Sequence, residues 1–192
     1  MERDAMIAKR YPKEVVLTDG REVTLRPIEE TDREAVLAFY DRMPPDETWF
    51  YKDVPSDPEV VRRWVASLRS GEAVSILALD GERVAAHAAL LARRHGGRRH
   101  IGRLRLRIDP GYRGKRLGNW MLFDMIRRAM ELGLEILRAE FVVGVEDEAA
   151  EALRAWDFGQ ETILEGYLKD RAGNPCDYRI MLKRLHKEWS DF

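Results

Sequence analysis

Residues 104–122 decide the fold of this protein, and they read LRLRIDPGYRGKRLGNWML. Arginine alternates with leucine or isoleucine up to Ile108, and this period of two predicts a β-strand over 103–108. From Leu117 onward, apolar residues recur every four positions, which predicts an amphipathic helix over 116–132 that ends at Gly133. A short basic loop with several glycines therefore joins the end of a strand to the start of a helix.

This loop has the features of an anion-binding site. The first N–H groups of a helix lack intrahelical partners, and the helix dipole favours negative charge beside them. The loop glycines let a ligand approach the backbone closely. The segment is not a Walker A loop, because no Gly-Lys-Ser/Thr follows four variable residues, and its glycines lack the Gly-x-Gly-x-x-Gly spacing of a dinucleotide fingerprint.

The charge of the chain is distributed unevenly. It has 33 Lys and Arg against 34 Asp and Glu, a net charge of −1. Residues 93–116 contain nine Arg and one Lys against the single acid Asp109, a net +9, so the rest of the chain carries −10. Such a basic block suggests an anionic ligand, either nucleic acid or a small molecule with several phosphates. A solvated arginine-rich hairpin is the alternative interpretation.

Composition narrows the class of protein. A chain of 192 residues with 45% apolar residues suits a single domain over 1–192, with its core over about 15–185. Cys176 has no partner, which excludes an intrachain disulfide or a cysteine-rich metal site, and we expect no bound metal. No apolar run approaches the roughly 20 residues of a membrane helix, and residues 1–4 lack the apolar region of a secretory signal. We therefore expect a cytoplasmic protein with no membrane partner.

Hydrophobic periodicity and turn residues predict the other elements. Asp19-Gly20 and Asp80-Gly81 are hairpin signals, and Thr31 with Glu34 fits a capping box at a helix start. The predicted strands are 14–17, 22–26, 73–79, 83–91, 103–108, 136–143, 160–168 and 176–183, and the predicted helices are 31–43, 58–69, 116–132 and 146–156. Strands and helices mixed in one unit predict an α/β or α+β sandwich rather than a doubly wound sheet.

Several side chains have local roles to predict. Asp109 is expected to cap the loop rather than to do chemistry, and His87 is expected to be a hydrogen-bonded core histidine. The aromatic triplet 49–51 lies in a less regular stretch, where it would either line an acceptor pocket or pack the stretch onto the core. The residues expected to face inward from the last helix are Ala149, Ala152, Leu153 and Trp156.

At the strand, loop and helix described above, the sequence resembles the GNAT superfamily of N-acetyltransferases. The acyl-CoA signature of that superfamily is Arg/Gln-x-x-Gly-x-Gly/Ala, and Arg113-Gly114-Lys115-Arg116-Leu117-Gly118 matches it at the first and last positions. Arg116 stands where the middle glycine would be. Residues 19–27 are similar, more weakly, to bacterial protein-lysine acetyltransferase domains, and the whole resemblance spans about 15–185.

The resemblance implies a fold and a co-substrate. The fold is a mixed, mostly antiparallel sheet of about seven strands, splayed between its central parallel strands and flanked by about four helices. The co-substrate is acetyl-CoA, with its pantetheine arm along the strand and its pyrophosphate at the loop. The implied cofactor-binding residues are Leu106, Arg107, Ile108, Arg113, Gly114, Lys115, Arg116, Leu117, Gly118 and Asn119.

The reaction implied by the resemblance is direct attack of a primary amine on the thioester of acetyl-CoA. An alkyl ammonium with a pKa near 10 must first lose a proton, so a base is needed. Glu140 is the first candidate because it is an acid in an otherwise apolar predicted strand, and the alternative is an ion pair with one of the arginines at 103, 105 or 107. Glu146 is the second candidate, and the alternative is a plain acid at a helix start.

Three functions are therefore compared. The first is an N-acyltransferase whose partner is an amine acceptor, either a small molecule or a protein. The acidic remainder of the chain would suit a cationic acceptor such as a lysine side chain or a polyamine. The second is an inactive acyl-CoA-binding module, since Leu153 takes the place of the tyrosine that often acts as the family's general acid. The third is a nucleic-acid binder using the hairpin 93–107, which the lack of interleaved aromatic residues disfavours. Proteins of this fold often form homodimers.

Overall fold

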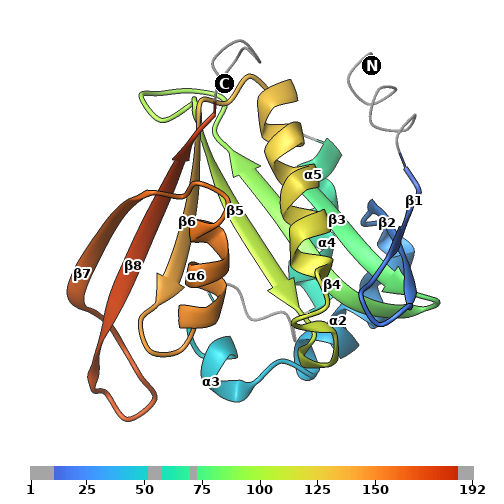
Figure 1. Cartoon of the computed structure of the whole chain (residues 1–192), viewed down its shortest axis with the longest axis horizontal. Helices are drawn as coiled ribbons and strands as arrows, with labels where there is room; N and C mark the ends of the chain where they lie inside the picture. The colour runs from blue at the N-terminus through green and yellow to red at the C-terminus, as the bar shows by residue number, and fades with distance from the viewer. Residues whose placement is uncertain (1–10, 52–57, 70–72, 186–192) are drawn as a thin grey trace. The chain divides into compact units, whose positions relative to one another are not determined.

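The computed structural model describes residues 11–51, 58–69 and 73–185 (Figure 1). Its strands are β1 (Lys13–Val16), β2 (Glu22–Pro27), β3 (Ala73–Asp80), β4 (Arg83–Ala92), β5 (Ile101–Ile108), β6 (Ile136–Val142), β7 (Gln160–Lys169) and β8 (Pro175–Arg184). Its helices are α2 (Arg33–Asp41), α3 (Pro45–Thr48), α4 (Pro58–Arg69), α5 (Leu117–Glu131) and α6 (Asp147–Arg154), with two 3-10 turns, η1 (Glu30–Asp32) and η2 (Pro110–Tyr112).

The strands form one mixed sheet in the order β1-β2-β3-β4-β5-β6-β8-β7. β5 and β6 are parallel, with residues 101–103 paired to residues 136–138, and β6 pairs antiparallel with β8 over seven positions. A parallel pair needs a crossover connection, which α5 supplies between β5 and β6. The predicted mostly antiparallel sheet with a central parallel pair is confirmed, although the described residues form eight strands rather than about seven.

The chain divides into two compact units, each with its own share of the sheet. The first unit comprises Met1–Met43, Pro55–Ala89 and Leu106–Asp124, and the second comprises Pro44–Val54, Leu90–Arg105 and Met125–Phe192. The single domain expected over 1–192 stays a prediction, as does the splay of the central strands. Among the described residues, none of the helices is both long enough and apolar enough to span a membrane.

In the first unit, helix α4 covers the strand β3. Helix α2 packs against α4, and α4 packs against β3. Six consecutive residues of β3, from 74 to 79, are buried, as expected for a strand in the interior of a sheet. The fully buried side chains of this unit include Val36, Phe39, Val61, Ile76, Leu77, Leu117 and Met121.

In the second unit, β6, β8 and β7 form an antiparallel sheet with α6 packed on β6. Gly102 of β5 lies against three leucine side chains, and a Cβ there would lie 2.7 Å from Leu134 Cδ1 and 2.8 Å from Leu90 Cδ1. A larger residue would therefore overpack this part of the core. The predicted inward spacing of α5 is confirmed, because Leu117, Met121, Met125 and Ala129 are all buried.

The capping box lies two residues earlier than predicted, so the assignment to Thr31 and Glu34 was wrong. Asp32 accepts the N–H of Glu29 at 2.7 Å and the guanidinium of Arg26 at 2.6 and 2.7 Å. The ion pair from the neighbouring strand β2 holds Asp32, and this makes Asp32 the returning acid of the box. Helix α2 begins after it, at Arg33.

Two other local predictions need correction. The stretch expected to be irregular contains α3, a short helix with Pro45 at its first position, where proline is well tolerated. In α6, Ala150 and Leu153 are buried, whereas Ala149 and Ala152 are exposed. Alanine occupies positions 149, 150 and 152, so residue type alone does not show which of them faces inward.

Candidate functional site

The predicted strand, loop and helix are all present in the first unit. β5 ends at Ile108, η2 turns the chain, and α5 begins at Leu117. Two loop residues, Gly114 and Arg116, have positive φ values of 70° and 64°, and they reverse the chain so that it enters the helix. The carbonyl of Arg116 accepts the N–H groups of Asn119 and Trp120 at 3.1 and 3.3 Å, so the first turn starts at the loop itself.

Gly118 lets the start of α5 lie close to the end of β5. A Cβ at this position would lie 3.0 Å from Ile108 Cδ1 and 4.0 Å from Leu106 Cδ2. These three residues were predicted to bind the same ligand, and the close approach brings them together within the first unit. The backbone N–H groups of Leu117 and Gly118 lie in the first turn, where a helix has no partners of its own for them.

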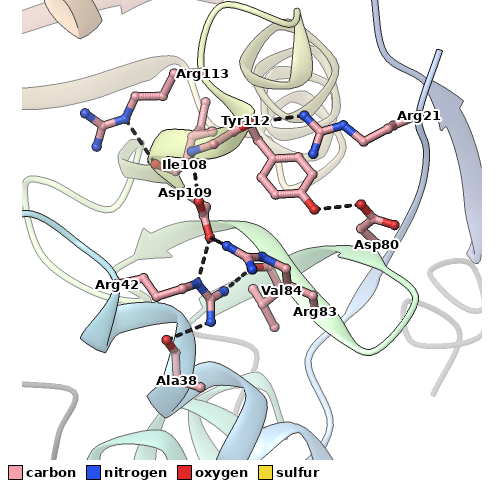
Figure 2. A network of polar contacts seen from close by, with 11 residues as sticks. Arg21, Ala38, Arg42, Asp80, Arg83, Val84, Ile108, Asp109, Tyr112 and Arg113 are labelled. Carbon is pink, nitrogen blue, oxygen red and sulfur yellow. Dashed lines mark hydrogen bonds and ion pairs between the residues drawn. The ribbon is translucent and has the colours of Figure 1, made fainter. Parts of the chain in front are cut away.

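Asp109 anchors the loop (Figure 2). Its buried carboxylate accepts the backbone N–H of Gly111 at 2.9 Å and so caps η2. The same carboxylate accepts Arg42 Nε and Arg83 Nη2, both at 2.8 Å. The predicted cap is present, and the two arginines are additional partners that the sequence did not reveal.

The environment of Asp109 favours its ionised form. Burial opposes ionisation, but the hydrogen bonds from Arg42, from the Gly111 N–H and from Arg83 outweigh it, so the pKa of Asp109 is lowered. An ionised carboxylate with three donors is a fixed point for the loop, because each donor comes from a different part of the first unit.

Tyr112 fastens the other side of η2 to the neighbouring strands. Its buried hydroxyl donates to Asp80 at 2.6 Å, and the Arg21 guanidinium lies 4.0 Å from the centre of its ring. Arg21 also donates to the carbonyl of Gly111 at 3.0 Å. Burial and the bond to Asp80 raise the pKa of Tyr112, so its hydroxyl stays a donor.

The basic side chains of the loop have different surroundings. Lys115 is ion-paired with Asp19 at 2.9 Å, and its carbonyl accepts the N–H of Thr18 at 3.4 Å. Arg113 Nε donates to the carbonyl of Ile108 at 3.2 Å. The Arg116 side chain is exposed, and no interaction partner for it is found among the residues that the structure describes.

Glu140, the first predicted base, lies in the second unit on β6. It is ion-paired with Arg103 and, at 2.7 Å, with Arg138, and it accepts the hydroxyl of Tyr178 at 2.5 Å. The ion pair with Arg103 is the alternative that the sequence offered for this residue. Burial and the bond to Glu140 raise the pKa of Tyr178. Neither Arg138 nor Tyr178 was predicted: Tyr178 reaches Glu140 through the pairing of β6 with β8, whereas Arg138 precedes Glu140 by two positions on β6, so the period of two could have found it.

Glu146, the second predicted base, is the N-cap residue of α6. Its carboxylate accepts the N–H of Val142 at 3.0 Å, and its own N–H donates to the carbonyl of Val142 at 3.0 Å. Glu146 therefore ties the end of β6 to the start of α6, in keeping with the helix-start role that the sequence gave as the alternative.

Two other predicted side chains have hydrogen bonds or packing contacts. His87 is buried in the first unit, with Tyr40 Oη 2.7 Å from Nδ1 and Ser75 Oγ 2.7 Å from Nε2, as expected of a core histidine. In the second unit, Trp49 Nε1 donates to the carbonyl of Lys169 at 2.8 Å, and Arg171 lies over its ring. Trp49 thus fastens α3 to the β7–β8 turn. Within the described ranges, no group of three or more His, Cys, Asp and Glu side chains is arranged to hold a metal ion.

Comparison with models of protein families identifies the family of this chain. The model described as the Acetyltransferase (GNAT) family matches residues 31–158, more than half of the chain, and the matched span includes β5, the loop and α5. The chain belongs to the GNAT family of acetyltransferases.

Solved structures share the GNAT fold with this chain at low sequence identity. A GNAT-family acetyltransferase from Streptococcus pneumoniae is 21% identical, with a TM-score of 0.72 and coverage of 84% of this chain and 99% of that one. A ribosomal-protein-alanine N-acetyltransferase from Brucella melitensis is 24% identical, with a TM-score of 0.71 and coverage of 84% and 99%. A phosphinothricin acetyltransferase from Sinorhizobium meliloti, solved with AcCoA, is 20% identical, with a TM-score of 0.72 and coverage of 88% and 91%. No curated protein matches the sequence.

Two departures from the GNAT pattern have structural consequences. Arg116, at the place of the middle glycine, has the left-handed conformation that glycine adopts without strain, so the backbone of the loop keeps its shape at an energetic cost. Leu153, where the sequence resemblance puts the family's tyrosine, is buried in α6. It supplies apolar packing there and no proton donor.

Replacing Arg116 by glycine is expected to stabilise this GNAT protein. A non-glycine residue in the left-handed region costs about 1–2 kcal/mol, part of which the greater freedom of glycine in the unfolded chain offsets. We expect R116G to raise the free energy of unfolding by about 1 kcal/mol, or the melting temperature by about 2–4 °C, measured by urea and thermal unfolding. The matched control is R113G, which replaces a residue with a φ of −67°. A stability gain in the control, or a loss in R116G, would contradict this account.

Replacing Asp109 by asparagine is expected to destabilise the protein in a pH-dependent way. At pH 7 the change removes the charge that holds Arg42 and Arg83, at a cost of about 2 kcal/mol. The folded pKa of Asp109 lies below its unfolded value of about 3.9, so its contribution is complete above that pH and is lost as the pH falls through the folded pKa. The difference between wild type and D109N should therefore shrink below about pH 4, in denaturant titrations at several pH values. D41N, at the exposed end of α2, should show neither effect.

Proposed function

We propose that this GNAT protein transfers the acetyl group of acetyl-CoA to a primary amine. The observation that carries the proposal is the loop between β5 and α5, anchored by Asp109, with Gly118 bringing the helix start to within contact of the strand end. Among the relatives of known structure, the Sinorhizobium meliloti enzyme was solved with AcCoA, which supports the same co-substrate here.

The loop would hold the pyrophosphate through its backbone. The N–H groups of Leu117 and Gly118 are the donors of the helix start, and Gly114 beside them is exposed and has no side chain to cover the loop backbone. Of the side chains, Arg116 is exposed and suited to a phosphate oxygen. Lys115 would contribute its backbone, because its ammonium group is ion-paired with Asp19. The backbone of residues 106–108 would lie along the pantetheine arm.

The transfer itself needs one proton acceptor and one proton donor. The ammonium group of the substrate amine gives a proton to the base, and the neutral nitrogen attacks the carbonyl carbon of the thioester. A carbon–nitrogen bond forms, the carbon–sulfur bond breaks, and the thiolate of CoA takes up a proton. Leu153 is buried and carries no hydroxyl, so this proposal assigns the last proton to water.

Glu140 is the base in this proposal, with Glu146 as the second candidate. Glu140 already has two arginines and one hydroxyl as partners, so it accepts a proton only by loosening one of these contacts. The Glu146 carboxylate accepts the N–H of Val142, so removing this carboxylate would act mainly on the turn between β6 and α6.

Glu140→Gln is expected to lower kcat by about 10²–10⁴-fold, the usual contribution of a general base. Glu146→Gln is the matched comparison and should lower kcat by less than about tenfold, because an amide oxygen still accepts the Val142 N–H. Release of CoA is followed by thiol detection, and thermal melts establish that both variants are folded. Equal kcat values for wild type and E140Q would rule out Glu140 as the base.

Acetyl-CoA is expected to raise the melting temperature of the protein. Ligand at about 100 times its dissociation constant adds roughly 2.7 kcal/mol to the free energy of unfolding, which corresponds to about 5–10 °C for a chain of this size. CoA should give a similar shift, and ATP should give none. The absence of a shift with acetyl-CoA and CoA would contradict the proposed function and direct attention to the hairpin over 93–107 and nucleic acid.

A shift with acetyl-CoA but no turnover with any amine would support a second candidate, a module that holds acyl-CoA without transferring the acetyl group. Buried Leu153 in place of the tyrosine is the observation that favours it.

A further inference from the structure

We infer that the amine acceptor carries a carboxylate close to its amino group, as amino acids do, and that Arg103 and Arg138 bind this carboxylate. The inference rests on the proposed function, because it names the class of acceptor for the same reaction. It is carried by a cluster of four side chains in the second unit, Arg103, Arg138, Glu140 and Tyr178, hereafter the arginine cluster.

Strand pairing places the arginine cluster on one face of the sheet. Arg103 of β5 lies opposite Arg138 of β6 in the parallel pair, and Glu140 follows two residues later on the same face. Tyr178 of β8 lies opposite Val142, again on that face. Four polar residues from three strands therefore meet, although nearly 40 residues separate Tyr178 from Glu140 in the sequence.

The arginine cluster has too little negative charge for its positive charge. Two guanidinium groups share the single carboxylate of Glu140, which leaves a net charge of +1, and Tyr178 stays neutral because burial raises its pKa. Glu140 is 9% exposed, whereas Arg103 and Arg138 are 29% and 30% exposed. The unbalanced positive charge is therefore the part of the cluster that solvent reaches.

Hydrogen bonding in the cluster is incomplete as well. The Nε atoms of Arg103 and Arg138 are buried and have no hydrogen-bond partner in the described part of the chain. Buried donors without acceptors are rare in folded proteins, and each one costs free energy. The Nε atoms are too buried for a ligand to reach, but a second carboxylate at the exposed ends of the two guanidinium groups would cancel the excess charge, in the bidentate geometry that arginine favours.

The hairpin of β7 and β8 adds an exposed aromatic ring beside the arginine cluster. Tyr167 of β7 stacks on Tyr178 with ring centres 5.4 Å apart, and it is 64% exposed. The pairing of β7 and β8 is irregular between Leu164 and Leu168, and the N–H of Gly166 donates to Asp177 at 2.8 Å. Bulges of this kind re-aim side chains near functional sites, and here the exposed ring is available to the hydrocarbon part of an acceptor.

The charge of the cluster selects between acceptor classes. A polyamine or a lysine side chain would bring positive charge to a site that already carries +1, contrary to the expectation from the acidic remainder of the sequence. An α-amino acid with a neutral side chain carries its ammonium and carboxylate on one carbon atom and has no net charge. Its carboxylate would lie on the arginines while its ammonium lies beside Glu140, the proposed base.

The first experiment compares matched acceptors with the wild-type protein. CoA release from acetyl-CoA is measured with a panel of L-amino acids, with the amide of each amino acid, and with polyamines and a lysine-containing peptide. The amides keep the amine and the side chain, and their lower amine pKa gives them more free amine. We expect kcat/KM to be at least tenfold higher for the preferred amino acid than for its amide, and higher than for any polycation.

The second experiment uses variants of the arginine cluster. R138Q is expected to lower kcat/KM for the amino acid at least tenfold more than for its amide, with the difference mainly in KM. R138K keeps the positive charge but lacks the two parallel N–H donors of a guanidinium group. Its kcat/KM for the amino acid should therefore lie between the values for the wild type and R138Q. The matched control is R127Q, on α5, where Arg127 pairs only with Glu131 among the described residues. The acetyl-CoA shift in the melting temperature shows that each variant is folded.

The outcomes separate this inference from the proposed function. Equal or higher kcat/KM for the amides, or a preference for polyamines or the peptide, would overturn the inference and leave the acyltransferase intact. An equal loss for amino acid and amide in R138Q would assign Arg138 a structural role and overturn the inference too. No CoA release with any member of the panel would overturn the proposed transfer and the inference together.

Discussion

The loop that defines this GNAT protein depends on one buried carboxylate. Asp109 holds the Gly111 N–H, Arg42 and Arg83, and through them it connects η2 to the end of α2 and to the start of β4. A loop rich in glycine and arginine has many conformations of similar energy, and its own positive charges repel one another. A single ionised acid with three directed donors removes that freedom, so the N–H groups at the start of α5 are preorganised for an anion before it binds.

The same loop shows how a family pattern tolerates a substitution. The backbone must take a left-handed conformation at the position of the middle glycine, and Arg116 takes it too. The strain is small compared with the contacts that the anchored loop makes, so the fold persists. What changes is chemical: the position now carries an exposed guanidinium group beside the helix start. The departure from the signature therefore adds a basic side chain where the ligand's phosphates are proposed to lie.

In the second unit the sheet itself builds the polar chemistry. Antiparallel pairing of β6 with β8 and parallel pairing with β5 bring Arg103, Arg138, Glu140 and Tyr178 together on one face. An acid in an apolar strand is costly unless it is paired, and here it is paired twice. The second arginine that pairs with Glu140 leaves one positive charge in excess, so the residues that stabilise this part of the sheet are also those proposed to bind the acceptor.

The sequence by itself determined the strand, loop and helix at 103–132, most of the other elements, the cap by Asp109 and the core position of His87, because these depend on short-range periodicity, turn chemistry and burial. It placed the capping box at Thr31 and Glu34 and put Ala149 on the inward face of α6, and both were wrong: an ion pair from Arg26 of β2 holds Asp32, and neighbouring alanines do not show which of them faces inward. Only the tertiary structure decided that Lys115 pairs with Asp19, that Arg42 and Arg83 hold Asp109, and that Tyr178 reaches Glu140. Those partners are distant in sequence. The identity of a charged side chain does not indicate which distant residue of opposite charge the folded chain will place beside it.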